Sequence, residues 1–415
     1  MSKELEKLAD LVYKCIRCGA CRSVCPTFGE ELSETVVARG RMALVEAVID
    51  GRLDMGEAFE NTIFGCAMCG ACKANCPAGV DVPKVIEEAR AVLAKEKGSQ
   101  SLARYLARRS LKDKKALDGA FAMMALGRAF YAPLAATPLA KFLPYQYKDM
   151  KRNLPKMPRR PLPKRVPEHS TVDNAKGRVV FYAGCVVNYV YPEIGEAAVH
   201  VLNAAGYDVR IIRDELCCGK PLSSLGEMDA YRKLAEQVVA QVGGSEVDAV
   251  LTACPTCALT LKEDYPKILP DSKEAAVLSD RVEDVNRFLT KNTDILKGIE
   301  PIASTVTYHD PCHLNFGMGI KAEPRELLKA STSGLVEMAG AEKCCGFGGS
   351  FSFLNYALSG KIASKKAGAA IATGADIVAT ACPGCMMHMR DGLKQAGGKQ
   401  EVLHTLQIIE KALKK

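Results

Sequence analysis

Two short stretches, CIRCGACRSVCP at residues 15–26 and CAMCGACKANCP at residues 66–77, decide the organisation of the N-terminal part of this chain. Both follow the pattern C-x2-C-x2-C-x3-C-P. Three cysteines at this spacing place their thiolates around one face of a small cluster, and Gly19 or Gly70 lets the backbone approach it. The fourth cysteine, which precedes proline, cannot curl back to the same cluster and belongs with the triplet of the other stretch.

The pattern therefore predicts two cubane [4Fe–4S] clusters. Their expected ligands are Cys15, Cys18, Cys21 and Cys76 for the first, and Cys66, Cys69, Cys72 and Cys25 for the second. Zinc also accepts four thiolates, but zinc sites usually come as two separated C-x2-C pairs.

Helical periodicity fills the sequence around these runs. Apolar residues recur through Glu34–Gly51, which ends in a glycine suited to a helix C-terminus, and Val82–Lys97 continues helically after the second run. We expect an α-helical ferredoxin over residues 1–100.

Composition narrows the class of protein. The chain has 415 residues, enough for two or three domains, with 48% hydrophobic and 25% charged residues. The absence of Trp and an aromatic content of 6% argue against a carbohydrate binder or a stacking platform for nucleic acid. The chain opens without the apolar core of a secretory signal, so we expect a cytoplasmic protein whose 18 cysteines serve metal or redox chemistry and not disulfides.

Residues 101–170 form a basic and apolar segment. Between Arg90 and Pro167 there are 19 Lys and Arg against 4 Asp and Glu, whereas the whole chain has a net charge of only +8. The apolar stretch from Asp118 to Pro144 is broken by charges and prolines and is too short to span a bilayer. A Pro-rich basic linker at residues 151–167 follows, and we expect it to form no core.

Three interpretations of this segment stay open: peripheral contact with a membrane surface, docking of an acidic partner subunit, and a plain connector. Nucleic-acid binding is not expected, because nothing besides charge supports it.

The C-terminal half of the chain repeats itself. Three cysteine motifs occur twice in the same order: RVVFYAGC (178–185) and TVTYHDPC (305–312), CCG (217–219) and CCG (344–346), TACPTC (252–257) and TACPGC (380–385). Equivalent cysteines are 127 or 128 residues apart throughout, which indicates an internal duplication.

Within each copy, β-runs alternate with helical stretches, which is typical of α/β layers with mainly parallel strands. VDAVLTAC (247–254) and ADIVATAC (375–382) are examples of such β-runs. Because each cysteine group follows a β-run, the thiols should gather at one edge of the sheet. We expect two tandem α/β domains at residues 171–300 and 301–415, so the fold class is α plus α/β.

Each copy carries five cysteines, one more than a cubane cluster needs. Adjacent cysteines such as Cys217 and Cys218 splay apart, so they suit different irons better than one. A zinc site, a C-x2-C dithiol pair and inert buried thiols are the alternatives that the residues leave open.

The chain resembles the CCG-domain iron–sulfur oxidoreductases. The resemblance rests on a lone cysteine, a CCG triplet and a C-x2-C pair, which occur twice behind the two-cluster module. This family includes the D subunit of heterodisulfide reductase, the iron–sulfur subunits of glycolate oxidase and lactate dehydrogenases, and the C subunit of anaerobic glycerol-3-phosphate dehydrogenase. The resemblance covers essentially the whole chain from Cys15 onward.

In heterodisulfide reductases the CCG motifs bind non-cubane [4Fe–4S] clusters that cleave a disulfide. The resemblance therefore implies one or two additional clusters here, cubane or non-cubane. Their implied ligands are Cys185, Cys217, Cys218, Cys254 and Cys257 in the first copy, and Cys312, Cys344, Cys345, Cys382 and Cys385 in the second.

Local sequence adds further resemblance. Residues 184–222 are similar to the glycerol-3-phosphate and glycolate relatives, and residues 308–319 and 344–352 to lactate-utilisation proteins. These relatives partner a separate flavoprotein and work at or near the membrane. No flavin is expected in this chain, since the glycines at 346, 348 and 349 belong to the cysteine motif and not to a G-x-G-x-x-G.

Two functions follow from this resemblance, both within anaerobic respiratory or energy metabolism. One is an electron-transfer subunit between a flavoprotein dehydrogenase, or an electron-transfer flavoprotein, and a membrane quinone. The other is a disulfide reductase that uses the CCG clusters and is fed by a cytochrome b subunit or another donor.

Three histidines lie near second-copy cysteines in the sequence and lack equivalents in the first copy: His309, His313 and His388. Disulfide and quinone reduction both consume protons, which a histidine can supply. We therefore expect the second copy to be the reactive one, although strand-end capping by these rings stays open.

Overall fold

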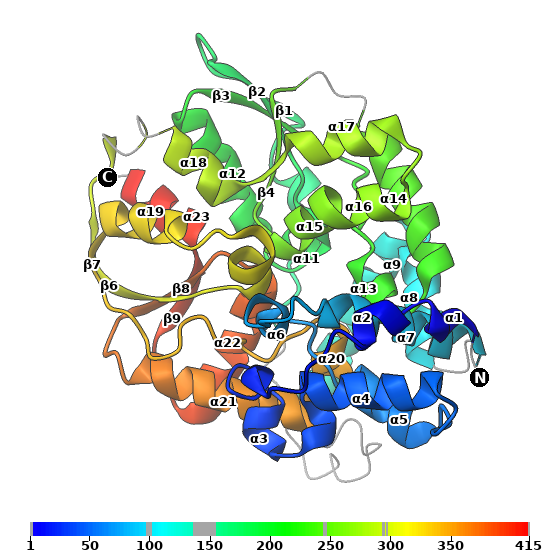
Figure 1. Ribbon diagram of the computed structural model, residues 1–415. Coiled ribbons are helices and arrows are strands. Elements are labelled where there is room, and N and C mark those ends of the chain that lie inside the picture. Colours follow the sequence, from blue (N-terminus) through cyan, green and yellow to red (C-terminus); the bar gives the residue numbers. More distant parts are fainter. Residues whose placement is uncertain are drawn as a thin grey trace.

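The chain is described here from a computed structural model. The structure describes residues 3–96, 102–135, 155–243, 247–292, 295 and 298–413. Figure 1 shows a helical N-terminal part in blue at the lower right, with one α/β part in green above it and a second in yellow to red on its left.

The N-terminal part is built from short helices around its own core. Its elements are α1 (Lys3–Glu6), α2 (Ala9–Val12), η1 (Ala20–Arg22), α3 (Phe28–Glu31), η2 (Glu34–Val36), α4 (Ala38–Ile49), α5 (Glu57–Phe64), α6 (Ala71–Ala74) and α7 (Val82–Glu96). The helix expected from Glu34 begins only at Ala38, because Val37 is extended at φ −91° and ψ 159°. It ends where expected, since Gly51 takes the left-handed φ of 70° that glycine favours.

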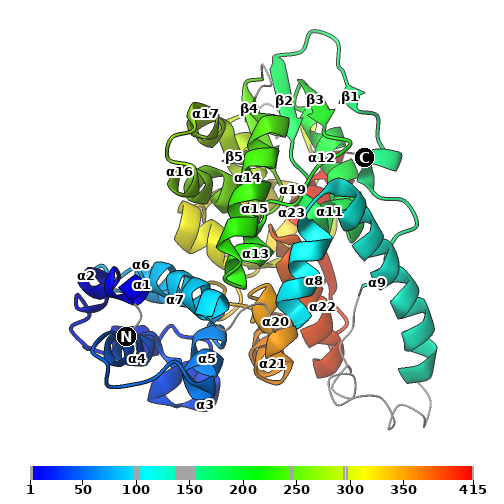
Figure 2. The same ribbon diagram turned by 90° about the vertical axis from the view of Figure 1, so that its right-hand side faces the viewer.

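Two helices form the basic segment, α8 (Leu102–Leu111) and α9 (Lys114–Ala135). The helix α8 ends at Leu111, and α9 begins three residues later, at Lys114. In Figure 2, α8 lies against the body of the molecule and α9 runs down its outer side. The apolar stretch expected up to Pro144 continues beyond Ala135, outside the described residues.

The first repeat contains a sheet of five strands in the order β1-β3-β2-β4-β5. The strands are β1 (His169–Ser170), β2 (Gly177–Phe181), β3 (Tyr207–Ile211), β4 (Ala249–Thr252) and β5 (Val282–Asp284). Only β1 pairs antiparallel, and the others are parallel as expected. The helices of this repeat are α11 (Gly184–Tyr189), α12 (Pro192–Ala204), α13 (Lys220–Ser224), α14 (Met228–Val242), α15 (Pro255–Leu259), η5 (Thr260–Asp264), α16 (Tyr265–Ile268), α17 (Lys273–Arg281) and α18 (Val285–Lys291).

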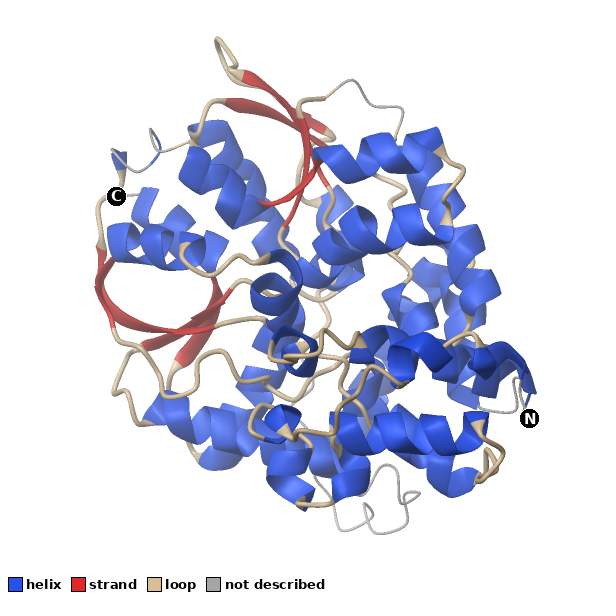
Figure 3. Cartoon of the chain, viewed as in Figure 1, coloured by secondary structure: helices blue, strands red, loops and turns tan. Residues whose placement is uncertain are grey.

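The second repeat has a parallel sheet in the equivalent order, β7-β6-β8-β9. Its strands are β6 (Ile302–His309), β7 (Thr332–Leu335), β8 (Ile377–Thr380) and β9 (Glu401–His404). Its helices are η7 (His313–Gly317), α19 (Glu323–Ser331), α20 (Ser350–Leu354), α21 (Tyr356–Ile371), α22 (Pro383–Ala396) and α23 (Thr405–Leu413). Figure 3 shows the two sheets as separate red layers surrounded by blue helices.

The two repeats share one hydrophobic core. Buried residues of α12, such as Ile194 and Val201, belong to the same apolar cluster as Leu406 and Ile409 of α23. The duplicated units are therefore packed directly on each other, which fixes the position of one cysteine group relative to the other.

The Pro-rich linker, which we expected to form no core of its own, contributes a side chain to the core of the first repeat. Leu162, in the short helix η4 (Leu162–Lys164), is 1% exposed and packs into the first-repeat core. It fills the space beside Gly195, where an added Cβ would come within 2.4 Å of its side chain. Proline keeps this stretch out of regular structure but does not prevent single apolar side chains from being buried.

Candidate iron–sulfur centres

The eight N-terminal cysteines are brought together around two cavities. The first, of about 380 Å³, is lined by Cys15, Cys18, Cys21, Cys72 and Cys76, and the second, of about 390 Å³, by Cys25, Cys66, Cys69 and Cys72. Each triplet thus meets the Cys-Pro cysteine of the other run, with Cys72 bordering both cavities. Gly19 and Gly70, which follow the second cysteine of each triplet, have φ of 88° and 78°, so each occupies a conformation that favours glycine.

The ten remaining cysteines lie near the carboxyl ends of the strands. Cys254 and Cys382 are the N-cap residues of α15 and α22, directly after β4 and β8. Cys312 follows β6 at the start of η7. Cys185 of the first copy likewise follows β2, which ends at Phe181, and lies in the first turn of α11.

In the first copy, neighbouring thiols contact one another in a row. The Sγ atoms of Cys185 and Cys217 are 3.6 Å apart. Cys217 also contacts Cys218, Cys218 contacts Cys257, and Cys257 contacts Cys254. The five cysteines that the duplication singles out therefore form one group.

In the second copy the arrangement is the same. The Sγ atoms of Cys345 and Cys385 are 3.5 Å apart. Cys385 contacts Cys382, and Cys345 contacts Cys344, which in turn contacts Cys312.

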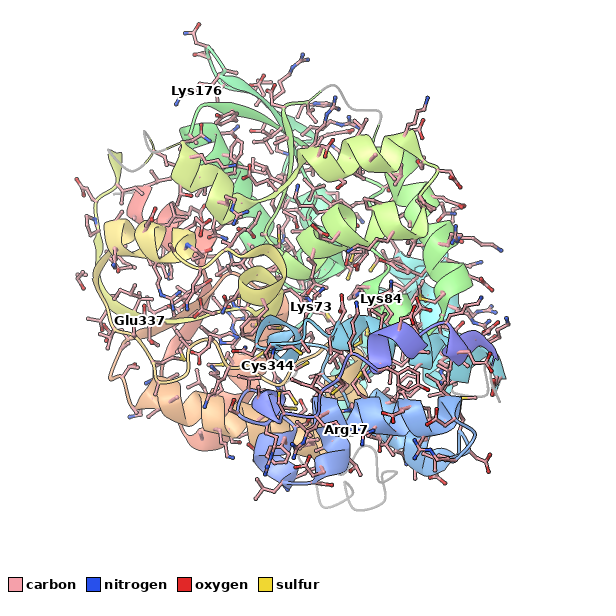
Figure 4. All side chains as sticks on the ribbon, in the orientation of Figure 1. Arg17, Lys73, Lys84, Lys176, Glu337 and Cys344 are labelled. Atoms are coloured by element: carbon pink, nitrogen blue, oxygen red, sulfur yellow. The ribbon has the colours of Figure 1, made fainter. Side chains whose placement is uncertain are left out.

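Two contacts join these groups to each other and to the N-terminal part. The thiols of Cys254 and Cys382 share a hydrogen bond between the two copies. The thiols of Cys69 and Cys344 share another, in a small apolar cluster with Ala71. Figure 4 labels Cys344, which lies where the blue N-terminal part meets the second repeat. An unbroken line of thiol contacts thus runs from Cys69 to Cys185.

The protonation of these thiols reflects their crowding. Burial raises the pKa of Cys25, whereas in each copy one thiol has a pKa well below its ordinary value. For Cys254 the donors are Cys257 and Cys382, and for Cys345 they are Cys344 and Cys385. Clusters of buried sulfur in which neighbours stabilise a thiolate are suited to a metal, which accepts thiolates and relieves their repulsion.

The donor set fits iron–sulfur clusters. All 18 cysteines are free thiols, and all lie in the described part of the chain. The backbone also leaves room beside the sulfur atoms: Gly184 has a φ of 72°, and a Cβ there would come within 2.8 Å of Cys257 Sγ. The residues that would hold the clusters are those expected from the two N-terminal runs and the two CCG copies.

The three histidines occupy different surroundings. His309 is fully buried, and a ring nitrogen lies within 4.8 Å of the Sγ atoms of Cys345 and Cys385. Burial, together with Lys366, lowers its pKa to about 3, so the ring is neutral. Its Nδ1 lies 3.2 Å from the carbonyl oxygen of Ala341.

The rings of His313 and His388 contact side chains that the sequence analysis did not predict to be part of the site. His313 is half-buried, and its Nδ1 lies 2.8 Å from the Thr256 hydroxyl in the C-x2-C motif of the first copy. His388 is buried on α22, with Nε2 2.9 Å from the Ser359 hydroxyl. His313 therefore lies between the two copies, whereas we expected it to belong to the second copy alone.

Two further residues of the site were not predicted. Glu215 is buried and accepts hydrogen bonds from the backbone N–H groups of Ala183 (2.8 Å) and Gly184 (2.7 Å), which fixes the turn that carries Cys185. Burial raises the pKa of Glu215 to about 8. A glutamate two residues before each CCG triplet, Glu215 and Glu342, was the available signal in the sequence.

Arg90 is the second such residue. Its guanidinium group is 2% exposed and donates to the carbonyl oxygens of Cys66 (2.7 Å) and Ser224 (3.0 Å), so it ties the N-terminal part to the first repeat. Lys220 does the same through Glu87 at 3.0 Å. The sequence around a buried arginine in an amphipathic helix does not indicate its burial, because the carbonyl oxygens to which it donates are distant in the chain.

Family comparisons agree with this geometry. Residues 179–262 and 306–390 match the model of the cysteine-rich CCG domain, and residues 11–80 match that of a 4Fe-4S dicluster domain. The chain is 31% identical to a probable glycolate oxidase iron-sulfur subunit of Bacillus subtilis, over 97% of this chain and 94% of that protein. The chain belongs to the CCG-domain iron–sulfur oxidoreductases.

A member from Methanosarcina barkeri, the D subunit of dihydromethanophenazine:CoB–CoM heterodisulfide reductase, is 27% identical over 96% of this chain and 93% of its own length. The fold is also similar to a crystal structure of a hypothetical protein from Helicobacter pylori, with a TM-score of 0.52 at 12% identity, covering 100% of this chain and 72% of that one. The two CCG domains and the dicluster domain of this family member thus indicate iron–sulfur clusters in an oxidoreductase subunit.

Proposed function

We propose that the chain is the electron-transfer subunit of a heterodisulfide-reductase-like, membrane-associated redox complex. In that complex it passes electrons between a flavoprotein dehydrogenase of the lactate, glycolate or glycerol-3-phosphate type and a membrane quinone. The line of thiol contacts from Cys69 to Cys185 is the observation that carries the proposal. Iron–sulfur clusters supply one-electron redox chemistry when bound. The protein's part is to hold them in sequence and away from water, and eight of the ten CCG thiols are buried.

The proposed cofactors are two cubane [4Fe–4S] clusters in the N-terminal part and one or two additional [4Fe–4S] clusters at the CCG motifs. Five thiols in each copy suit a non-cubane cluster, which has more ligand positions than a cubane. The flavin belongs to a partner, either the dehydrogenase itself or an electron-transfer flavoprotein, and a cytochrome b subunit is a further partner on the quinone side.

The complex is proposed to lie in the cytoplasm, peripherally on the membrane. No helix within the described residues combines the length and apolar character needed to cross a bilayer. Exposed apolar residues instead gather near the middle of α9: Met123 is 75% exposed, Met124 47% and Leu126 62%.

These three residues fall within about 160° around the axis of α9, since successive residues of a helix are about 100° apart, and so form one broad exposed apolar face. A helix that lies in the lipid interface buries one such face. The basic residues Lys112, just before α9, and Lys115, in its first turn, are exposed, which suits anionic lipid headgroups. Contact with a membrane surface therefore accounts for both features, and docking of an acidic subunit accounts for the charge alone.

A catalytic disulfide reductase is the second candidate function. It is favoured by two complete five-cysteine sets and by the likeness to a heterodisulfide reductase subunit. In either function His313 and His388 are the candidate proton donors near the second-copy cysteines, whereas His309, expected as a third, is a poor donor because burial lowers its pKa to about 3. His313 is the most accessible of the three, because the other two rings are fully buried.

Anaerobic purification from the native host tests the proposal. We expect a brown protein with iron and sulfide in equal amounts, about four of each per cluster, and a co-purifying flavoprotein. A colourless or zinc-loaded protein that is folded and functional would overturn it. If the reduced protein instead cleaves a thiol disulfide without a flavoprotein, the second function replaces the first.

A further inference from the structure

One of the differences between the two CCG copies is a residue close to their cysteines. The last residue of β6 is His309, three positions before Cys312. The same position in the first copy, three before Cys185, is Tyr182. The duplication therefore carries the same set of five cysteines in both copies but an imidazole in only one of them at this place.

The hydrogen bonds of the two residues show that they are not interchangeable. The Tyr182 hydroxyl donates to the carbonyl oxygen of Leu216 at 2.6 Å, so its polar atom is committed to the backbone. His309 also meets a backbone carbonyl, that of Ala341, but only with Nδ1. The second ring nitrogen of His309, Nε2, makes no contact with this carbonyl oxygen.

The tautomer of His309 follows from that contact. A carbonyl oxygen only accepts, so Nδ1 carries the proton and a neutral ring presents a bare lone pair at Nε2. Nε2 is buried and finds no hydrogen-bond partner among the described residues. A buried nitrogen without a partner costs free energy unless something else binds it.

The thiols of Cys345 and Cys385 are within reach of this ring. A ring nitrogen of His309 and the two Sγ atoms all lie within 4.8 Å of one another, and all three residues are buried. Metal-binding histidines commonly use one nitrogen as the ligand while the other donates to a carbonyl oxygen. The two nitrogens of His309 divide in the same way, because Nδ1 donates to Ala341 and Nε2 is the nitrogen without a partner.

We propose that His309 is an iron ligand of the second CCG site, so that this copy has mixed cysteine and histidine coordination while the first copy has cysteine alone. This inference rests on the proposed iron–sulfur function. Iron–sulfur centres with neutral histidine ligands have higher reduction potentials than centres held by thiolates alone, so we expect the second site to be the more oxidising of the two.

A second difference acts in the same direction. Lys366 of α21 is 5% exposed, and its ammonium group donates to the carbonyl oxygen of Ala341 at 3.2 Å. The equivalent position in α14 is Val238 or Val239, depending on the offset of 128 or 127. A positive charge beside thiolates stabilises the reduced, more negative state of their cluster. Lys366 therefore separates the potentials of the two copies without being a ligand.

The test is pulsed EPR on the full chain, purified anaerobically, reconstituted with iron and sulfide, and labelled with ¹⁵N-histidine. We expect the reduced wild-type protein to show the strong nitrogen coupling of a coordinated imidazole. His309→Ala should lose this coupling and shift one midpoint potential downward, and His309→Tyr, which installs the first-copy residue, should do the same. Neither result depends on turnover.

Two controls separate ligation from other effects. His200→Ala removes an exposed imidazole that pairs with Glu410 and should leave the coupling and all potentials unchanged. Lys366→Met should lower one potential and retain the coupling. A second-copy signal without histidine coupling in the wild-type protein would overturn the ligand assignment alone. Absence of any CCG-site signal would overturn the proposed function with it.

Discussion

The thiol of Cys69, in the second cysteine run, shares a hydrogen bond with the thiol of Cys344, in the CCG triplet of the second repeat. The N-terminal part therefore meets the second copy directly, and the first copy lies beyond it through Cys254 and Cys382. We therefore expect electrons that leave the N-terminal part to reach the second copy before the first.

Magnetic coupling tests this order without any electron donor of known identity. Two paramagnetic clusters joined by neighbouring ligands broaden each other's EPR signals, so the fully reduced protein should show a broadened signal from the Cys66 triplet. The double variant Cys345→Ser/Cys385→Ser should sharpen it. The equivalent first-copy variant, Cys218→Ser/Cys257→Ser, should leave it broad, and the reverse pattern would contradict the proposed order.

The cysteines that line the two N-terminal cavities give a second prediction. Cys76 lines the same cavity as Cys15, whereas Cys25 lines the other one. Cys15→Ser and Cys76→Ser should therefore perturb the same EPR signal, and Cys25→Ser the other. If Cys76→Ser instead perturbed the signal that depends on Cys66 and Cys69, each run would hold its own cluster.

Much of this organisation could be predicted from spacing alone. The cysteine runs predict crossed ligation, since a Cys-Pro cannot return to its own triplet, and the fixed offset of 127 or 128 residues predicts two equivalent sheets. Both are local or periodic signals. The alternation of β-runs and helices likewise predicted parallel strands, which the pairing of β2 with β3 and β4 confirms.

The contacts between the N-terminal part and the two repeats could not be predicted from local or periodic signals. The hydrogen bond between Cys69 and Cys344 joins residues 275 positions apart, and it depends on how Arg90 and Lys220 dock the N-terminal part. The local sequence of α7 does not indicate to which carbonyl oxygens the buried Arg90 will donate. For the same reason the sequence could not tell that Leu162, among prolines and basic residues, fills a space beside Gly195.

Arg90 offers a test of this docking. Its buried guanidinium group donates to carbonyl oxygens of both units, and lysine cannot reach the same set from one ammonium group. Arg90→Lys should leave buried carbonyls unsatisfied and cost on the order of 2–4 kcal/mol. Thermal unfolding should show a Tm lower by several degrees. Arg52→Lys, an exposed control, should change the Tm little.

The exposed apolar residues of α9, Met123, Met124 and Leu126, give a prediction about membrane binding. Sedimentation with vesicles of phosphatidylserine and phosphatidylcholine should pull down the wild-type protein, more weakly at high salt. The variant Met123→Glu/Leu126→Glu should lose most of this binding, because both side chains would have to leave the apolar boundary. Val277→Glu, at a 42% exposed position on α17, is the matched control and should bind as the wild type does.

Failure of the wild-type protein to bind vesicles would contradict the membrane interpretation. If Met123→Glu/Leu126→Glu then also failed to hold a co-purifying subunit, α9 would be a protein interface instead. Charge reversal at Lys112 and Lys115 separates the two contributions, since about 1 kcal/mol of attraction to an anionic surface is expected for each basic residue near it.

Asp284 makes the stability of the first repeat depend on pH. It caps α18 by accepting from the backbone N–H of Asn286 at 2.9 Å, and burial raises its pKa to about 7. Since an unfolded aspartate ionises near pH 4, the folded state binds the extra proton between these values. The stabilisation is therefore fully present below about pH 4 and is lost as the pH rises towards 7, by a few kcal/mol in all.

Asp284→Asn keeps the capping oxygen and removes the ionisation. Relative to the wild type, this variant should gain stability steadily from pH 4 to pH 8, and thermal unfolding across this range measures the gain. Asp271→Asn removes an exposed carboxyl group and should show no such trend. A difference between Asp284→Asn and the wild type that stays constant with pH would mean that the Asp284 carboxyl ionises in the folded protein as it does in the unfolded chain.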